Sequence, residues 1–414
     1  MSQPKAELRG AYFSLAVLAA VNTLNYLDRY VVAGVLPRIS EEFGLNKAQG
    51  GTLQMVFVLV YMLVSPASGY LGDRIQRRHV VAGSVFLWSL ATVGSGLAGT
   101  FVALLGARAV LGVGEAGYGT VAPAIISDLF PRERRTRMLA YFFVAMPVGA
   151  AVGYALGGWI GDAYSWRLAF FLGGAPGRVA SALMLFTREP ARGATEGGPA
   201  VHEKIPLGEG LRRLAPNRVY LASTGGLTLL TFSIGGLAIW MPTFLEKERG
   251  MDPSQAGFIF GACTLVAGMA GTILGGVLGD RADKRRPGGG MWLAGTAMLA
   301  AAPFMFLTAT VQWVPLIFGL AFVAQVGLFV NTGPINAAVV NAVPPSYRSF
   351  AVGLSNLTLH ALGDAISPPL IGAVADASSL ARAIQVNTLP VVLGGLCMMW
   401  GARQHAHKDR PAAS

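Results

Sequence analysis

The sequence predicts an all-α membrane protein with twelve transmembrane helices arranged as two pseudo-symmetric six-helix bundles. Its 414 residues are 53% hydrophobic and 13% charged, against about 25% charged in a typical soluble domain. The stretch Gly69–Arg74 (Gly-Tyr-Leu-Gly-Asp-Arg) returns 207 positions later as Gly276–Arg281 (Gly-Val-Leu-Gly-Asp-Arg), and 207 is half the length of the chain. Self-similarity at this period in so apolar a chain indicates a transporter built from two parallel membrane-embedded halves.

Windows of about 20 apolar residues locate the individual spans. They lie near 11–36, 50–72, 79–99, 101–129, 137–162, 168–187, 218–243, 255–279, 290–310, 313–342, 350–374 and 381–402. Between the halves, 188–216 is rich in Gly and Pro with one short amphipathic piece at 207–214, which predicts a cytoplasmic connector. The domains are therefore 1–187, the connector 188–216, and 217–414. Spans and loops consume almost the whole chain, which excludes a soluble enzyme.

The net charge of +11 follows membrane topology. If the loops after the even-numbered spans and both termini share one side, that side holds 23 of the 32 Lys and Arg. Cationic short loops stay in the cytoplasm, so we expect both termini inside a multi-pass protein of the cell (inner) membrane. This distribution excludes nucleic acid as a partner. Cys263 and Cys397 fall inside spans without metal-like spacing, so we expect no metal site and two small core residues.

The repeated signature ends a span with a carboxylate followed by cations. It comprises Gly69, Asp73, Arg74, Arg77 and Arg78 in the first copy, and Asp280 and Arg281 in the second. Its presence in both halves predicts a shared structural task, namely a latch that closes the cytoplasmic side in one of two states. Alternatively, Asp73 and Asp280 only cap helices. Neither interpretation makes them substrate ligands.

Several charges lie where the membrane is most apolar. Asn25, Tyr26, Asp28 and Arg29 are in span 1, and Arg108 and Glu115 are in span 4. A charge at the centre of a span costs at least about 2.5 kcal/mol, so it must find a partner or a wet cavity. Aligned through the repeat, Arg108 and Glu115 meet Gly319 and Val326. The duplicated scaffold stands without these charges, which suggests that they serve function.

The spacing of these residues restricts their partners. Arg108 and Glu115 are seven residues apart, about 10 Å along a helix, so they cannot pair with each other. We hypothesise that Asp28, Arg29, Arg108 and Glu115 form a network in which a carboxylate gains or loses a proton as the cavity switches sides. An anionic substrate that draws the arginine away would free the carboxylate to protonate. The alternative is a static buried ion pair between spans 1 and 4.

Span 11 adds His360 and Asp364, which at i and i+4 meet on one helix face. His360 is a candidate second titrating group. A local hydrogen-bonded pair that shapes the helix before Pro368 accounts for the pattern equally well.

Five strings resemble the spinster branch of the major facilitator superfamily. They are Asn25–Tyr30, Gly112–Tyr118, Ala122–Phe130, Pro147–Gly149 and Leu359–Pro368. The resemblance implies the major facilitator fold, alternating access, and an amphipathic lipid-like substrate such as sphingosine-1-phosphate or a lysophospholipid. It also implies that Arg29 lies near the anionic head and that Asp28 and Glu115 are proton sites. The compact sequence is similar to bacterial members of the branch.

Polar and aromatic residues interleave in several spans, as suits a ligand with an apolar tail and a polar head. The candidate substrate-binding residues are Arg29, Asn25, Tyr26, Arg108, Tyr118, Thr228, Phe232, Asn331 and Asn356. For any one of them, packing between helices or facing lipid is the alternative.

Together these features predict a secondary transporter that exchanges protons for an amphipathic, anionic lipid or lysolipid. We expect the protein to be a monomer surrounded by membrane lipids. Protons are the coupling ion, and no other cofactor is expected. The rivals are a proton-coupled multidrug exporter, a small organic-anion carrier and, from a different class, a passive lipid scramblase.

Overall fold

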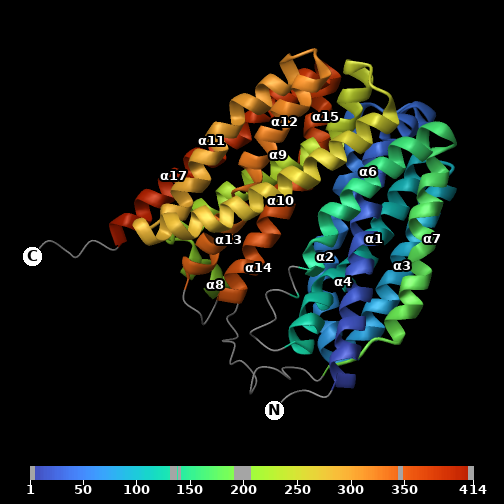
Figure 1. Ribbon diagram of the computed structural model, residues 1–414, viewed down its shortest axis with the longest axis horizontal. Helices are drawn as coiled ribbons and strands as arrows, with labels where there is room; N and C mark the ends of the chain where they lie inside the picture. Colours follow the sequence, from blue (N-terminus) through green and yellow to red (C-terminus); the bar gives the residue numbers. More distant parts are fainter. Residues whose placement is uncertain (1–4, 131–137, 139–140, 191–206, 344–347, 409–414) are drawn as a thin grey trace, which may run out of the picture. The chain divides into compact units, whose positions relative to one another are not determined.

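The computed structural model describes residues 5–130, 138, 141–190, 207–343 and 348–408, and nearly all of these residues are helical (Figure 1). Twelve helical segments in this part of the chain are long and apolar enough to cross a membrane, which confirms the predicted number of spans. The chain divides into two compact units. Unit 1 comprises Met1–Ala200 and Gly250–Gly261, and unit 2 comprises Val201–Arg249 and Ala262–Ser414.

Unit 1 contains the first six spans. Its helices are α1 (Lys5–Phe43), α2 (Lys47–Arg74), α3 (Arg77–Leu97), α4 (Phe101–Leu129), α6 (Ala145–Ala163) and α7 (Trp166–Leu185). α1 packs against α6 and α7, α2 packs against α4, and α3 packs against both α4 and α7. α2 begins with a capping box, in which Asn46 and Gln49 each accept a hydrogen bond from the other's backbone N–H.

Unit 2 contains the remaining spans, three of which are interrupted. Its helices are α8 (Leu207–Leu214), α9 (Arg218–Arg249), α10 (Pro253–Arg285), α11 (Gly289–Thr310), α12 (Val314–Phe329), α13 (Thr332–Asn341), α14 (Arg348–Leu359), η2 (His360–Asp364), α15 (Ser367–Ala377), α16 (Leu380–Val386) and α17 (Thr388–Lys408). The first turns of α10 are grouped with unit 1. α9 packs against α17 and η2, and α11 packs against α12 and α17. The amphipathic piece predicted at 207–214 is α8, whereas residues 191–206 of the connector lie outside the described part.

The two copies of the repeated signature end differently. In the first copy, α2 stops at Arg74 and α3 starts at Arg77. In the second copy, α10 continues to Arg285, so Asp280 and Arg281 lie on the helix rather than at its end. The helix stops there because Pro287 cannot continue it and Gly288 adopts a left-handed φ of 70°.

A row of glycines brings α6 against α1, as the clustered glycines of the sequence lead one to expect. A Cβ atom at Gly149 would lie 2.3 Å from the Thr23 carbonyl oxygen, and one at Gly153 would lie 2.6 Å from that of Leu27. A Cβ atom at Gly157 would lie 2.5 Å from the Val31 carbonyl oxygen. The i, i+4 spacing therefore forms a groove for the α1 backbone, the close approach that lipid-embedded helices use for association. It fixes the segment of α1 that carries Asp28 and Arg29.

Gly153→Ala is expected to destabilise the protein by about 1–3 kcal/mol, because the added methyl group overpacks a backbone contact. Gly94, near the C-terminal end of α3, has nothing within 4 Å of the position of a Cβ atom. Gly94→Ala should therefore stabilise its helix by about 0.5–1 kcal/mol. Thermal unfolding of both variants in the same detergent measures the difference, and equal changes would contradict the role assigned to the glycine row.

Candidate functional site

An ion pair links α1 to α4 in the interior of unit 1. The Arg29 Nε atom lies 2.6 Å from Glu115 Oε2. The Glu115 side chain is fully buried, whereas 20% of the Arg29 side chain is exposed. Glu115 thus finds its cation on another helix, as its distance from Arg108 along α4 requires.

Three aromatic rings surround the Arg29 guanidinium. Its carbon lies 5.0 Å from the ring centroid of Tyr26 and 5.1 Å from those of Phe57 and Tyr61. Cation–π contacts of this kind hold a guanidinium while leaving its hydrogen-bond donors available. We call Tyr26, Phe57 and Tyr61 the aromatic cage.

Glycines of α4 let α2 carry two walls of this cage. A Cβ atom at Gly112 would lie 2.6 Å from the Phe57 carbonyl oxygen, and one at Gly119 would lie 2.7 Å from the Tyr61 hydroxyl oxygen. Phe57 and Tyr61 are four residues apart on α2, so both face α4. The site predicted from sequence did not include them, although this aromatic i, i+4 spacing was a signal that could have found them.

Arg108 and Asp28 complete the cluster on its inner side. Arg108 lies with its guanidinium carbon 5.2 Å from the Phe57 centroid, so this ring faces both arginines. The Arg108 Nη1 atom is 3.4 Å from the backbone carbonyl oxygen of Asp28. The Asp28 side chain is 1% exposed and lies beside Thr92 of α3 and Gly173 of α7. The structure therefore brings together all four residues of the hypothesised network.

Several polar atoms of the cluster are buried without a hydrogen-bond partner among the described residues. They are Asn25 Nδ2, Asp28 Oδ1, Arg108 Nε and Nη2, and Glu115 Oε1. Buried polar groups in proteins are nearly always hydrogen-bonded, so each unsatisfied one calls for an explanation, such as a functional role, strain, or a bound water or ion. The cluster therefore contains both donors and acceptors that form no hydrogen bond among the described residues.

The other predicted substrate residues occupy varied positions. Tyr118 is buried and donates from its hydroxyl to the Leu18 carbonyl at 3.0 Å. In unit 2, Thr228 bonds to the Thr224 carbonyl and Asn331 to the Gly327 and Leu328 carbonyls. Phe232 is half-buried and Asn356 is exposed. The bonds of Tyr118, Thr228 and Asn331 favour a packing role for these three residues, and their contact with substrate stays a prediction.

His360 and Asp364 meet as their spacing predicts. His360 Nδ1 lies 3.0 Å from Asp364 Oδ1, and both side chains are partly exposed. The five residues from His360 to Asp364 form a π-helical turn, closed by a bond from Ala365 N to His360 O. Pro368, which has no N–H, follows this turn, and Gly363 lies against the α9 backbone at Thr228. Single π turns often mark functional positions in helices.

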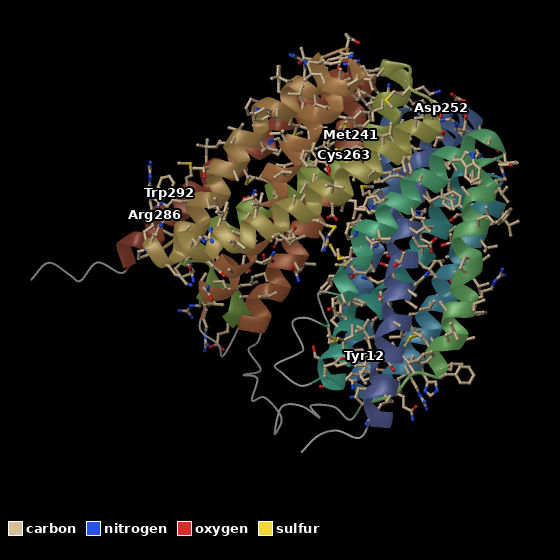
Figure 2. The ribbon with its side chains drawn as sticks, viewed as in Figure 1. Tyr12, Met241, Asp252, Cys263, Arg286 and Trp292 are labelled. Atoms are coloured by element: carbon tan, nitrogen blue, oxygen red, sulfur yellow. The ribbon has the colours of Figure 1, made fainter. Side chains whose placement is uncertain are left out.

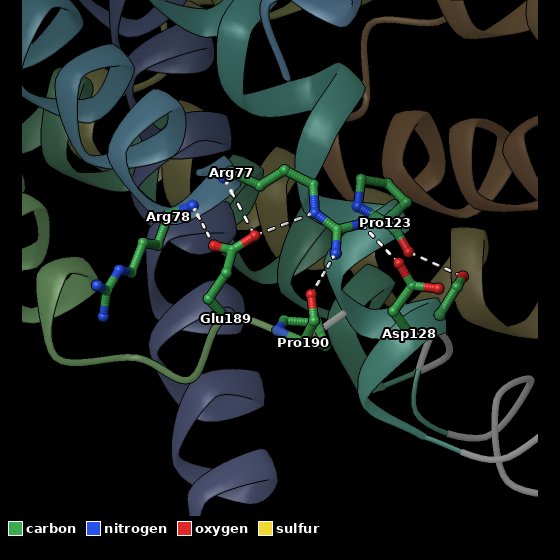
Figure 3. Close-up of polar contacts among 7 residues, drawn as sticks. Arg77, Arg78, Pro123, Asp128, Glu189 and Pro190 are labelled. Atoms are coloured by element: carbon green, nitrogen blue, oxygen red, sulfur yellow. Dashed lines mark hydrogen bonds and ion pairs between the residues drawn. The ribbon is translucent and has the colours of Figure 1, made fainter. Parts of the chain in front are cut away.

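One basic residue of the first repeat copy, Arg77, links separate segments of unit 1 (Figure 3). Arg77 is 5% exposed and reaches Asp128 on α4 at 2.7 Å, Glu189 at 3.4 Å and the Pro190 carbonyl at 3.0 Å. Glu189 also accepts from the backbone N–H groups of Arg77 and Arg78, so it caps the start of α3. Side-chain contacts of Gly69 and Asp73 lie outside the described part, while Arg74, Asp280 and Arg281 are exposed. These contacts of Arg77 lie within unit 1, and the latch stays a prediction.

Arg77→Ala is expected to destabilise the protein by about 3 kcal/mol, because it leaves Asp128 and Glu189 without their buried cation. Arg78 is the matched control, since its side chain reaches only Gln76 and the Leu185 carbonyl among the described residues. Arg78→Ala should change stability by less than about 1 kcal/mol. Thermal unfolding of the two variants compares these effects, and a larger loss for Arg78→Ala would refute the assignment.

Known proteins are similar to this chain in sequence and in fold. The model of the Major Facilitator Superfamily matches residues 18–368. The chain belongs to the Major Facilitator Superfamily. Within it, protein spinster homolog 3 of Danio rerio is 35% identical over 389 residues, which cover 90% of this chain and 78% of that protein. Protein spinster homolog 1 of Homo sapiens is 37% identical over 382 residues, covering 87% of this chain and 72% of that protein.

A solved structure agrees with this assignment at the level of the fold. The crystal structure of a bacterial homologue of the human lysosomal transporter spinster, inward-facing and unoccupied, aligns over both whole chains with a TM-score of 0.87 and 24% identity. The protein is thus a multi-pass, spinster-type transporter with the major facilitator fold, and not an enzyme.

Proposed function

We propose that this spinster-type protein couples proton movement to the transport of an amphipathic, anionic lipid or lysolipid across the cell (inner) membrane. One observation carries the proposal: the partly exposed Arg29 is shared between the aromatic cage and the buried Glu115. The same guanidinium can hold an internal carboxylate or the anionic head of a substrate. The cage rings offer an apolar surface to the adjoining tail.

Competition for Arg29 is the coupling step of this proposal. While Arg29 pairs with Glu115, the carboxylate is stabilised in its charged form. When an anionic head draws Arg29 away, Glu115 is left buried without its cation, and its neutral, protonated form becomes the favoured one. Asp28, sealed between α1, α3 and α7, is the second proton site of unit 1, and the His360–Asp364 pair is the candidate site of unit 2. Alternating access would expose these groups first to one face of the membrane and then to the other.

The direction of coupling follows from which ligands share a conformational state. The sequence suggests exchange of protons for substrate. If the anion and Glu115 compete for Arg29, however, protonation of Glu115 favours binding of the anion, so one conformational state holds both the proton and the substrate. Linkage then favours transport of the proton and the substrate in the same direction. The sign of the pH gradient that drives accumulation separates the two modes.

Transport into proteoliposomes with an imposed pH gradient tests the proposal. The panel comprises labelled lysophospholipids, sphingoid phosphates and cationic drugs, with Arg29→Ala as the control. We expect uphill movement of an anionic amphiphile by the wild type and none by the variant. Accumulation of a cationic drug instead would identify a multidrug exporter, and movement that ignores the gradient would identify a scramblase.

A further inference from the structure

A polar cavity lies in unit 2, where α10 turns into α11. Its volume is about 540 Å³, and its lining includes Lys284, Arg285, Arg286, Met291, Pro334 and Asn341. The three cations are exposed and follow one another along the chain, so they concentrate positive charge at one end of the helices. Met291 and Pro334 add an apolar wall. We call Lys284, Arg285 and Arg286 the basic turn.

Glycines fix the geometry of this turn. Gly288 takes a left-handed φ of 70°, which side-chain-bearing residues rarely adopt. A Cβ atom at Gly289 would lie 2.0 Å from the Ala282 carbonyl oxygen, so α11 starts directly against the end of α10. The Asp283 carboxylate, which also lines the cavity, accepts from the Gly290 backbone N–H at 2.7 Å. The acidic group of the cavity therefore caps α11, and the three cations follow it directly along the chain.

Comparison with the first repeat copy shows what the basic turn lacks. The offset of 207 places Lys284 at the position of Arg77, which is buried against Asp128 and Glu189. α13, the counterpart of the end of α4 that carries Asp128, contains no acidic residue, and the segment after α17 that would correspond to the one with Glu189 lies outside the described part. Within the described part of unit 2, no carboxylate forms an ion pair with Lys284 or Arg285. In the first copy the protein supplies the anion, whereas none of the described residues of the second copy supplies one to Lys284 or Arg285.

A tryptophan indicates the depth of this cavity in the membrane. Arg286 and Arg403 lie over the Trp292 ring, with their guanidinium carbons 5.0 and 5.8 Å from its centroid. Figure 2 shows Arg286 and Trp292 together near the end of α10. Tryptophan rings concentrate at the head-group level of membranes, where one edge is apolar and the other wet. An anion that reaches this cavity from the bilayer is therefore a lipid head group.

We propose that the basic turn binds the phosphate of an anionic glycerophospholipid from the cytoplasmic leaflet, with the glycerol end of the acyl chains against Met291 and Pro334. Basic pockets between transmembrane helices at this membrane surface have the chemistry that binds acidic head groups. This lipid is a bound component of unit 2 and is separate from the transported substrate. The proposal does not depend on the role of Arg29 or Glu115.

Thermal unfolding of the purified full-length protein with short-chain lipids tests this site. A ligand that binds the folded state raises the unfolding midpoint with its concentration. Dioctanoyl phosphatidylglycerol is expected to raise the midpoint, and dioctanoyl phosphatidylcholine is not. For Lys284→Gln/Arg285→Gln/Arg286→Gln, the half-maximal concentration of phosphatidylglycerol should increase at least about tenfold, because each cation near an anionic lipid contributes to binding. Native mass spectrometry of the same samples counts the bound lipids.

Two further variants keep the result interpretable. Arg212→Gln/Arg213→Gln/Arg218→Gln removes three exposed cations of the same unit outside the cavity and should leave the wild-type response. Arg285→Lys/Arg286→Lys keeps the charge and should retain most of the response even if the triple Gln variant folds poorly. If the Arg212/Arg213/Arg218 control variant weakened the response to phosphatidylglycerol as much as the triple Gln variant of the basic turn, the proposed site would be wrong. An equal response to inorganic phosphate at the same concentration would assign the cavity to a free anion and overturn the lipid proposal.

Discussion

Glu115→Gln is expected to uncouple transport from the proton gradient. Glutamine keeps the size of the side chain and can still bond to Arg29 across the 2.6 Å contact, but it cannot take up or release a proton. Coupling between two sites is typically about 1–3 kcal/mol, so the accumulation ratio in proteoliposomes should fall about 5–150-fold. Counterflow of substrate without any gradient should persist, because it needs no net proton transfer.

Asp162→Asn is the matched control for this substitution. Asp162 on α6 pairs with Arg38 on α1 at 2.7 Å, so it forms another Arg–carboxylate bridge of unit 1, but 42% of its side chain is exposed. Exposed pairs contribute about 1 kcal/mol or less. The accumulation ratio of the Asp162→Asn variant should therefore stay within about twofold of the wild-type ratio. A loss in Asp162→Asn as large as that in Glu115→Gln would show that breaking any bridge of unit 1 is enough to produce the effect.

Arg29→Ala is expected to have the largest effect on stability of the substitutions in the cluster. It leaves the fully buried Glu115 without its cation, which costs about 3–5 kcal/mol at pH 7. Removing both charges in Arg29→Ala/Glu115→Gln should restore most of that loss. It should not restore transport, since the group proposed to hold the anionic head is still missing.

A thermodynamic cycle over the wild type, both single variants and the double variant measures this interaction by thermal unfolding. The expected result is a double variant clearly more stable than Arg29→Ala. If the two losses simply add, Glu115 does not depend on Arg29 for its charge. Arg38→Ala, which breaks the bridge to the partly exposed Asp162, should change stability by about 1 kcal/mol or less.

The fold could be predicted because membrane insertion dominates the composition. Uncharged runs of about 20 apolar residues are typical of membrane-spanning helices and rare in soluble domains, and the constant period of the Gly-x-Leu-Gly-Asp-Arg signature disclosed the duplication. Where single helices end was harder to predict. The charges after Asp280 look like a loop by hydropathy, yet α10 extends over them, because a helix at the membrane surface needs no apolar side chains.

The charged residues of the candidate site could be predicted from the sequence, but the aromatic residues around them were harder to predict. Arg29 and Glu115 stood out because ionised groups inside spans are costly and rare. Phe57 and Tyr61 did not, because aromatic residues are ordinary members of a membrane helix. Only the three-dimensional approach of α2 to α4, permitted by Gly112 and Gly119, shows that they surround a guanidinium. The proposed lipid site likewise depends on structural contacts, because Arg77 is paired with Asp128 and Glu189 whereas its counterpart Lys284 forms no ion pair among the described residues.

In the proposed mechanism, protonation of the carboxylates beside Arg29 is linked to substrate movement. The most direct test records proton flux with an enclosed pH-sensitive dye while a labelled lysophospholipid is added to proteoliposomes. Wild-type protein should move protons together with substrate, Asp28→Asn should show a reduced signal, and Glu115→Gln should show none. Transport by both variants at the wild-type rate, with the wild-type response to an imposed gradient, would contradict the claim.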